Sequence, residues 1–464
     1  MTMSTYGSSG KSRRKSSGVT AMQDNNFELQ PINARDDMSI EDLSSEPAGE
    51  IDQASEIIVG VDVGTTKVCC VIAEVKNDLI EIIGTGFVAS RGIRKGVVVS
   101  IEETANYINK AISEAEDPAG RNVRESGCPV YISISGSHIR GSVSPAIILL
   151  HGKVIGERHM EEIKDFARIT RLPNDHTLIF SEVQEYSVDD LGGIKDPRGM
   201  SGVRLSASMY LVTAAIGDLN NLITCCQKAG LDVPLENVVL ESIASAEAVL
   251  KYEEREMGVV LIDIGGGTTG VAVYHNHTLQ HIREIAYGGH DLTEMLAEGW
   301  HTSMSAAEEL KDKFGAADPA IFKDNEYIVI PTPGDEDGGK VPRSVMARML
   351  EERMRELFQV INDDLVKVGV KGKIKSGVVL TGGAAELDAL TPLAETIFGL
   401  RVRRGYPEGF EGRDAGKISG ARFATAAGLI RYAQKTIGEY GGDWEGEGWG
   451  AKVAGWIGKK FLGK

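Results

Sequence analysis

The sequence predicts an α/β protein in which two similar lobes face one another across a nucleotide-binding cleft. Two segments, 57–75 and 259–274, carry the same pattern: a hydrophobic run, an aspartate, a glycine turn and a second hydrophobic run. Repeated units that cannot bury their own faces usually pack as pseudo-symmetric partners. A third segment, 377–390, has the pattern of a strand, a glycine pair and the start of a helix. Together the three segments predict two lobes with the ligand between them.

Segment 259–274 predicts a phosphate-binding hairpin. Asp263 ends its first hydrophobic run, where a polar group would emerge into a cleft. The turn that follows consists of Gly265, Gly266, Gly267 and Thr268. Glycine takes positive φ without steric cost and lets backbone N–H groups approach a phosphate, and threonine adds a hydroxyl donor. An ordinary β-hairpin with a glycine turn would show the same local pattern.

Segment 57–75 repeats this arrangement and makes the phosphate interpretation stronger. Its aspartate is Asp62, and its turn consists of Gly64, Thr65, Thr66 and Lys67. Two opposed aspartates, Asp62 and Asp263, would hold a hydrated Mg²⁺ through its water ligands. Lys67 would add a point charge for a phosphate.

The third glycine element follows a strand-like run in segment 377–390. Its turn is Gly382-Gly383, with Ala384 opening helix-forming sequence. Backbone at a helix start can lie against a phosphate or nucleoside. A plain strand-to-helix turn would look the same in isolation.

In this order and spacing, the three glycine elements resemble the two phosphate loops and the adenosine loop of the actin, Hsp70 and sugar-kinase superfamily. The resemblance implies an actin-like two-lobed ATPase fold that binds ATP with Mg²⁺. It also implies that Glu308 and Lys311, at i and i+3 of an expected helix over 306–314, contact the ribose and adenine. A solvent-facing ion pair is the alternative for these two side chains. The sequence contains no Walker-type phosphate loop.

Two further strings narrow the resemblance. GSHI at 136–139 and the segment 184–205, which contains DPRGMSG, are similar to the FtsA family of bacterial cell-division proteins. This resemblance implies an inserted subdomain, filament formation and contacts with other division proteins through that subdomain. It also implies binding of the C-terminal peptide of FtsZ, the division tubulin, and attachment to the cytoplasmic face of the inner membrane at the division site.

The expected domain organisation follows from composition and from this resemblance. The boundaries are a disordered N-terminal arm over 1–56, a first lobe over 57–91 and 180–257, an inserted subdomain over 92–179, a second lobe over 258–436, an FtsZ-binding subdomain at about 291–370, a linker over 437–448 and a membrane-targeting helix over 449–464.

Composition limits the classes of partner and compartment. The net charge of −17 argues against nucleic acid as the main partner. Five cysteines in two adjacent pairs and one single position, with no CxxC spacing, suggest reduced thiols, although Cys225-Cys226 could form a redox pair. No apolar run reaches the roughly 18 residues that a spanning helix needs.

The C-terminal segment 449–464 has the pattern of a helix that lies in a membrane surface. Its apolar side and flanking lysines are Trp449, Lys452, Val453, Trp456, Ile457, Lys459, Lys460 and Phe461. The pattern is imperfect, because Lys460 falls within the apolar arc. A short helix rich in Trp, Phe and Lys, beyond an otherwise complete domain, is what such an anchor requires. Docking of this tail back on its own domain is the alternative.

The second lobe offers further expectations. Residues 324–339 have the composition of a polar loop, and the amphipathic segment after it predicts a long helix. Arg343 and Arg348 are expected to be exposed and to suit an acidic peptide. Gly270 stands where many superfamily members have an acidic residue, so we expect slow hydrolysis of ATP and assign no catalytic residue. A small-molecule kinase and a rod-shape or pilus scaffold on the same fold remain alternatives.

Overall fold

A computed structural model describes residues 55–76, 79–169, 172–323, 325–332 and 335–440. The described part forms a single compact unit. The predicted N-terminal arm up to residue 54 and the predicted membrane helix over 449–464 lie outside the described residues.

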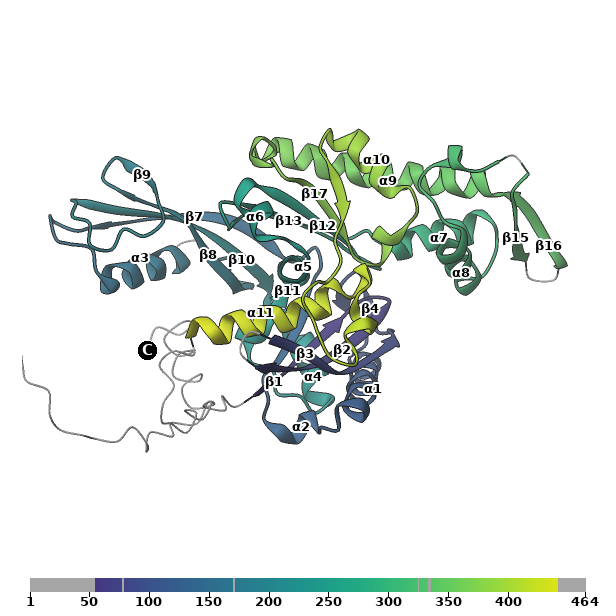
Figure 1. The fold of residues 1–464 in the computed structure, drawn as a ribbon, viewed down its shortest axis with the longest axis horizontal. Helices are drawn as coiled ribbons and strands as arrows, with labels where there is room; N and C mark the ends of the chain where they lie inside the picture. Colours follow the sequence, from purple (N-terminus) through teal and green to yellow (C-terminus); the bar gives the residue numbers. More distant parts are fainter. Residues whose placement is uncertain (1–54, 77–78, 170–171, 324, 333–334, 441–464) are drawn as a thin grey trace, which may run out of the picture. The chain divides into compact units, whose positions relative to one another are not determined.

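The first lobe is built on a five-stranded sheet with the strand order β11-β6-β1-β2-β3. Its strands are β1 (Glu56–Val63), β2 (Lys67–Lys76), β3 (Leu79–Ala89), β6 (Val130–Ile134) and β11 (Val238–Leu240). Its helices are α1 (Ile101–Ala119), α2 (Val123–Ser126), α4 (Ile216–Lys228) and α5 (Glu241–Val249), and α6 (Tyr252–Met257), which follows α5, packs on β13 (Thr269–His275) of the second lobe. β1, β2 and β3 run antiparallel, whereas β6 and β11 extend the sheet in parallel with β1. Figure 1 shows α1 and α11 (Ala424–Tyr440) covering this sheet.

The second lobe repeats this arrangement. Its sheet has the order β14-β13-β12-β17-β18, with three antiparallel strands and then two parallel ones. The strands are β12 (Val259–Ile264), β13 (Thr269–His275), β14 (Thr278–Ile285), β17 (Gly377–Thr381) and β18 (Val402–Arg404). The helices are α7 (Gly289–Gly299), α8 (Met304–Phe314), α9 (Arg343–Lys367) and α10 (Leu390–Phe398). The predicted internal repeat and two-lobed α/β fold are therefore confirmed.

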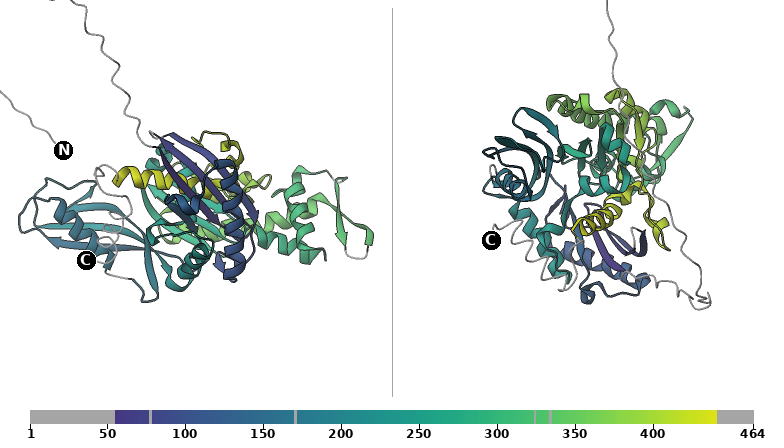
Figure 2. Two further views of the ribbon diagram at one scale, coloured as in Figure 1. Left: turned by 90° about the horizontal axis from the view of Figure 1, so that it is seen from below. Right: turned by 60° about the vertical axis from the view of Figure 1, so that its left-hand side comes forward.

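The inserted subdomain is a separate four-stranded sheet, ordered β7-β10-β8-β9, with its own hydrophobic core. Its elements are β7 (Arg140–Leu149), α3 (Glu157–Ile169), β8 (His176–Val188), β9 (Leu191–Ile194) and β10 (Arg204–Ala215). α3 covers one face of this sheet (Figure 2).

The predicted limits of the inserted subdomain, 92–179, are wrong at both ends. α1 packs on β2 and β3, and β6 pairs with β1, so residues up to 134 belong to the first lobe. β8 and β10 extend the subdomain to Ala215. The chain leaves the first-lobe sheet at residues 135–139, so β6 and β7, which are adjacent in sequence, join different sheets.

The predicted loop over 324–339 is also wrong, because β15 (Tyr327–Thr332) and β16 (Asp335–Pro342) form a hairpin there. β15 alternates buried and exposed side chains, with Ile328 and Ile330 buried in the second-lobe core. The period of two is the signal of a half-buried strand. The following helix, α9, is confirmed.

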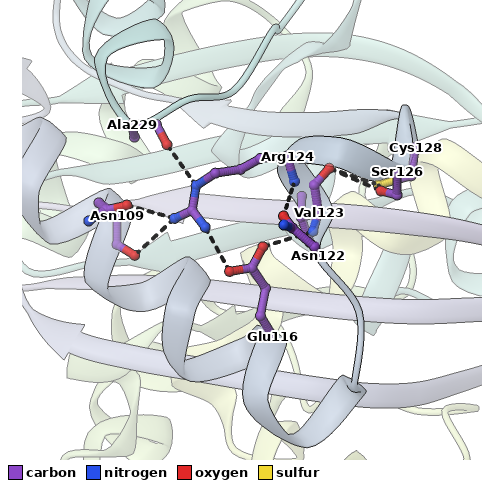
Figure 3. Close-up of polar contacts among 8 residues, drawn as sticks. All are labelled: Asn109, Glu116, Asn122, Val123, Arg124, Ser126, Cys128 and Ala229. Atoms are coloured by element: carbon purple, nitrogen blue, oxygen red, sulfur yellow. Dashed lines mark hydrogen bonds and ion pairs between the residues drawn. The ribbon is translucent and has the colours of Figure 1, made fainter.

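Arg124 ties three helices of the first lobe together (Figure 3). From α2, its guanidinium bonds the Glu116 carboxylate (2.7 Å) and the Asn109 amide oxygen (2.6 Å) on α1. Its Nε donates to the carbonyl of Ala229, the residue after α4 (3.1 Å). Because oxygens on α1 and at the end of α4 both accept from the Arg124 guanidinium, α2 and the end of α4 are held against α1.

All five cysteines are free thiols, and Cys69, Cys70, Cys225 and Cys226 are buried. The prediction of reduced thiols holds for these positions in the structure. α11 continues to Tyr440, so the first residues of the predicted linker are helical. Among the described residues, no helix is both long enough and apolar enough to cross a membrane.

Candidate functional site

A cleft of about 250 Å³ brings together residues from both lobes. Fourteen of the fifteen predicted nucleotide-binding residues line it: Asp62, Gly64, Thr65, Thr66, Lys67, Asp263, Gly265, Gly266, Thr268, Glu308, Lys311, Gly382, Gly383 and Ala384. The fifteenth, Gly267, packs against Thr65, because a Cβ at Gly267 would lie 2.5 Å from the Thr65 hydroxyl oxygen. The glycines of this turn therefore let the two predicted phosphate turns approach closely.

The first turn joins β1 to β2 at the floor of the cleft. The Gly64 N–H donates to the Lys67 carbonyl (3.0 Å) and closes the turn. The Lys67 ammonium lies 2.7 Å from one oxygen of Asp62, and the Ser133 hydroxyl donates to the other (2.9 Å). Burial alone would lower the pKa of Lys67, but the Asp62 carboxylate outweighs it and raises that pKa. Lys67 is therefore a permanent cation in the cleft.

The second turn joins β12 to β13 and is held by the start of α7. The Gly265 N–H donates to the Thr268 carbonyl (2.9 Å). The N–H groups of Gly289 and His290 donate to the carbonyls of Gly265 (2.9 Å) and Gly266 (2.7 Å). Asp291 is the third residue of α7, and its carboxylate accepts from the Gly288 N–H (2.8 Å).

Asp263 lies opposite Asp62, at the end of β12, and is buried. The hydroxyls of Ser245 and Thr425 both hydrogen-bond its Oδ2. Burial raises the pKa of Asp263 to about 6, with the Asp62 charge adding to the rise and the Ser245 hydrogen bond opposing it. At neutral pH the Asp263 carboxylate is therefore ionised in the folded protein, and this buried charge lowers the free energy of unfolding.

Glu241 also lines the cleft, and the sequence analysis did not identify it. β1, β6 and β11 are parallel, so their carboxyl ends meet at one edge of the sheet. Asp62 belongs to the first of these ends, and Glu241 directly follows the last. A polar residue directly after the buried run Val238–Leu240 was the available signal. Burial, with the charges of Asp62 and Asp263, raises the pKa of Glu241.

Glu284 supplies a carboxyl where the sequence has no side chain at Gly270. The two residues are partners across β13 and β14, and a Cβ at Gly270 would lie 3.0 Å from Glu284 Oε1. Glu284 is buried and accepts from the Ser242 hydroxyl (3.3 Å). Burial raises its pKa well above the usual range, with the charges of Glu241 and Asp263 adding to the rise.

The helix α8 places Glu308 and Lys311 along one wall of the cleft. The Lys311 ammonium lies 2.7 Å from the Glu308 carboxylate and 3.0 Å from the Gly289 carbonyl. The Lys311 side chain is only 9 % exposed and the Glu308 side chain is 43 % exposed, so this ion pair is buried at its lysine end and open to solvent at its glutamate end. Lys311 connects α8 to the helix that supports the second turn.

The third glycine element forms the remaining wall. Gly382 has a φ of 89°, and a Cβ there would lie 2.3 Å from Asp263 Oδ1. Glycine at this position therefore lets the adenosine-type turn and the β12 aspartate lie in contact. The other lining residues that the sequence analysis missed are Gly289, His290, Asp312, Arg422 and Thr425.

Arg343 is not exposed, contrary to the expectation. Its guanidinium lies 4.2 Å from the ring centre of Phe322, and its Nε donates to the Phe314 carbonyl (3.0 Å). The side chain is 23 % exposed. Arg348 is exposed, as expected.

The donors and charges of the cleft suit a nucleotide phosphate with a hydrated divalent cation. The glycine turns of the two lobes bring backbone N–H groups and the Thr65, Thr66 and Thr268 hydroxyls to the cleft, and Lys67 supplies positive charge. Within the described part of the chain, no group of three or more His, Cys, Asp or Glu side chains is arranged to hold a metal ion. Two carboxylates, Asp62 and Asp263, suit a Mg²⁺ ion that keeps most of its water ligands.

Two pseudo-symmetric lobes around such a cleft define an actin-like protein, and solved structures agree on the fold. The pilus protein complex PilM-PilN matches with a TM-score of 0.56 and 17 % identity, covering 80 % of this chain and 97 % of that one. MreB5 of Spiroplasma citri matches with a TM-score of 0.50 and 13 % identity, covering 84 % and 99 %. These similarities establish the fold alone.

Sequence relatives establish the family. Family models described as "Cell division protein FtsA" and "SHS2 domain inserted in FTSA" match residues 260–428 and 136–213. Cell division protein FtsA of Pseudomonas aeruginosa is 35 % identical over 381 residues, covering 82 % of this chain and 90 % of the relative. That of Neisseria meningitidis serogroup B is 34 % identical over 421 residues, covering 89 % and 100 %. The chain belongs to the FtsA family of cell division proteins.

Proposed function

We propose that this chain binds ATP with Mg²⁺ in the cleft between its lobes and acts in cell division as an actin-like adaptor that tethers FtsZ to the membrane. The observation that carries the nucleotide part is the pair of glycine turns facing one another beside Lys67, with Asp62 and Asp263 behind them. The MreB5 structure that shares this fold contains ADP. Membership of the FtsA family supports the role in division.

Each wall of the cleft would have a separate task. The two turns and Lys67 would bind phosphate oxygens, while Glu308 and Lys311 would contact the ribose and adenine. The bound Mg²⁺ would neutralise phosphate charge, and Asp62 and Asp263 would orient its water ligands. Gly382 to Ala384 would lie against the nucleoside.

We propose that hydrolysis is slow. Hydrolysis needs a group that orients the attacking water, and Glu241 is a carboxyl group that lines the cleft. Its raised pKa means that it keeps its proton near neutral pH, and a protonated carboxyl cannot accept a proton from water.

Calorimetric titration of the full chain with Mg-ATP tests the nucleotide site. We expect saturable binding in the wild type and a loss of at least tenfold in affinity in Lys311→Met. Lys228→Met is the matched control, because Lys228 makes an exposed ion pair with Glu102, and neither residue lines the cleft. Absence of saturable binding at millimolar Mg-ATP would contradict the proposal.

The membrane tether would use the C-terminal segment and the second lobe of the chain. We propose that segment 449–464 lies in the inner-membrane surface and that the second lobe binds the FtsZ C-terminal peptide, with exposed Arg348 as one contact. Self-association into filaments and binding of other division proteins through the inserted subdomain complete this role. All of these contacts rest on family membership and on the sequence pattern of the tail.

Co-sedimentation with anionic vesicles tests the tether. The full chain should sediment with vesicles and carry an FtsZ C-terminal peptide with it, whereas a chain ending at Gly448 should stay in the supernatant. Equal sedimentation of both chains would show that the tail is not the anchor.

A further inference from the structure

A short hairpin of the first lobe lies beside the two phosphate turns without lining the cleft. Its strands are β4 (Ile93–Arg94) and β5 (Val97–Val98), and its turn is Lys95-Gly96. Both turn residues have positive φ, 50° and 77°. These φ values fit a type I′ turn of a two-residue hairpin, whose first residue is usually Asn, Asp or Gly, so that a lysine there is uncommon. The geometry of the turn therefore does not favour a lysine at position 95.

Gly96 holds the first phosphate turn. Its N–H donates to the Thr65 hydroxyl oxygen (3.3 Å). A Cβ at Gly96 would lie 2.8 Å from the Ser135 carbonyl oxygen, so the tip of the hairpin packs directly on the chain that follows β6. The position of Lys95 relative to the first lobe is therefore well defined.

Lys95 reaches the second lobe. Its ammonium lies 3.0 Å from Asp291 Oδ1, and the other oxygen of Asp291 accepts from the Gly288 N–H (2.8 Å). The next two residues, Gly289 and His290, donate their N–H groups to the second phosphate turn. One two-residue turn is thus connected to both phosphate turns, through Gly96 on one side and Lys95 on the other.

We propose that the Lys95–Asp291 ion pair is a clasp between the lobes that positions the two phosphate turns and limits nucleotide release. This proposal rests on the proposed nucleotide function. A nucleotide enclosed by turns from both lobes leaves when the lobes separate, and separation breaks this pair. Lys95 and Asp291 are positioning residues, because neither lines the cleft.

The test is the release rate of a fluorescent ADP analogue, measured with Mg²⁺ by stopped flow after mixing with excess ATP. Lys95→Met retains a long side chain and the same backbone demand at φ 50°, so its fold should be preserved. Asp291→Asn keeps an oxygen to accept from Gly288. Each change should raise the release rate about two- to five-fold, as expected for a half-exposed pair, with little change in the association rate.

Three further results separate a clasp from a general loss of stability. The double variant Lys95→Met/Asp291→Asn should release no faster than the single variants, since they remove the same contact. Lys95→Arg should restore slow release. Added salt should speed release more from the wild type than from Lys95→Met, because only the wild type has this partly exposed pair to be screened.

Unchanged release rates in both single variants, alongside normal binding by the wild type, would overturn the clasp and leave the nucleotide site intact. Failure of the wild type to bind the analogue would overturn the proposed function, and the clasp with it. Lys228→Met again serves as the control for removal of a lysine away from the cleft.

Discussion

Asp263 should make the nucleotide-free protein less stable than asparagine would at the same position. Its pKa rises from an ordinary value of 3.8 to about 6 on folding. This difference of roughly two pH units, at ~1.4 kcal/mol per unit, amounts to about 3 kcal/mol of folding free energy at pH 7.5. Asp263→Asn removes the buried charge and keeps an oxygen that can accept from Ser245. We therefore expect the variant to be more stable by up to about 3 kcal/mol and to lose Mg-dependent binding.

The difference in stability between the wild type and Asp263→Asn should shrink as the pH falls. Because the folded pKa of Asp263 lies above the unfolded one, the folded wild type takes up its proton first as pH falls through about 6. The wild type then no longer carries the cost of a buried charge at Asp263. The difference in unfolding free energy between Asp263→Asn and the wild type should therefore disappear near pH 4. Urea unfolding without nucleotide at pH 7.5, 6 and 5 measures the gap, with the exposed Asp190→Asn as control. A gap that is absent at pH 7.5, or that does not change with pH, would refute the reasoning.

Three other predictions concern the same structure. Gly382→Ala should cost well over the ~1 kcal/mol expected for Gly399→Ala in thermal unfolding, since both have positive φ but only Gly382 has Asp263 where the Cβ would go. Arg124→Met should lower the unfolding free energy by about 2 kcal/mol, because Glu116 loses its partner, and Arg124→Lys should recover only part of this loss. Mg-ATP affinity should fall below pH 6, as Asp263 takes up its proton, and metal-free ATP affinity should fall less; a flat calorimetric profile from pH 7.5 to 5 would contradict this.

Local patterns predicted much of the fold and most of the cleft. The hairpins around Asp62 and Asp263, and the glycine pair at Gly382, are each complete within about 20 residues, so their signals survive in sequence. Their repetition then predicted two lobes. α9 followed from amphipathic periodicity, whereas α8 was expected from the resemblance to the superfamily.

What the sequence could not reveal depends on contacts between distant segments. Glu241 enters the cleft only because β11 pairs with β6, and β6 with β1, which no local pattern specifies. The inserted subdomain was misplaced because β6 and β7 are adjacent in sequence but join different sheets. Arg343 looked exposed, yet the fold brings Phe322 beneath its guanidinium.

The most direct test of the nucleotide cleft is photolabelling of the full chain with 8-azido-ATP and Mg²⁺, followed by peptide mapping. If the cleft binds the nucleotide, adducts should form in peptides from α8, around Glu308 and Lys311, and from the turn at 382–384. Excess ATP should suppress these adducts. Adducts confined to other parts of the chain, or labelling that excess ATP does not suppress, would contradict nucleotide binding in the cleft.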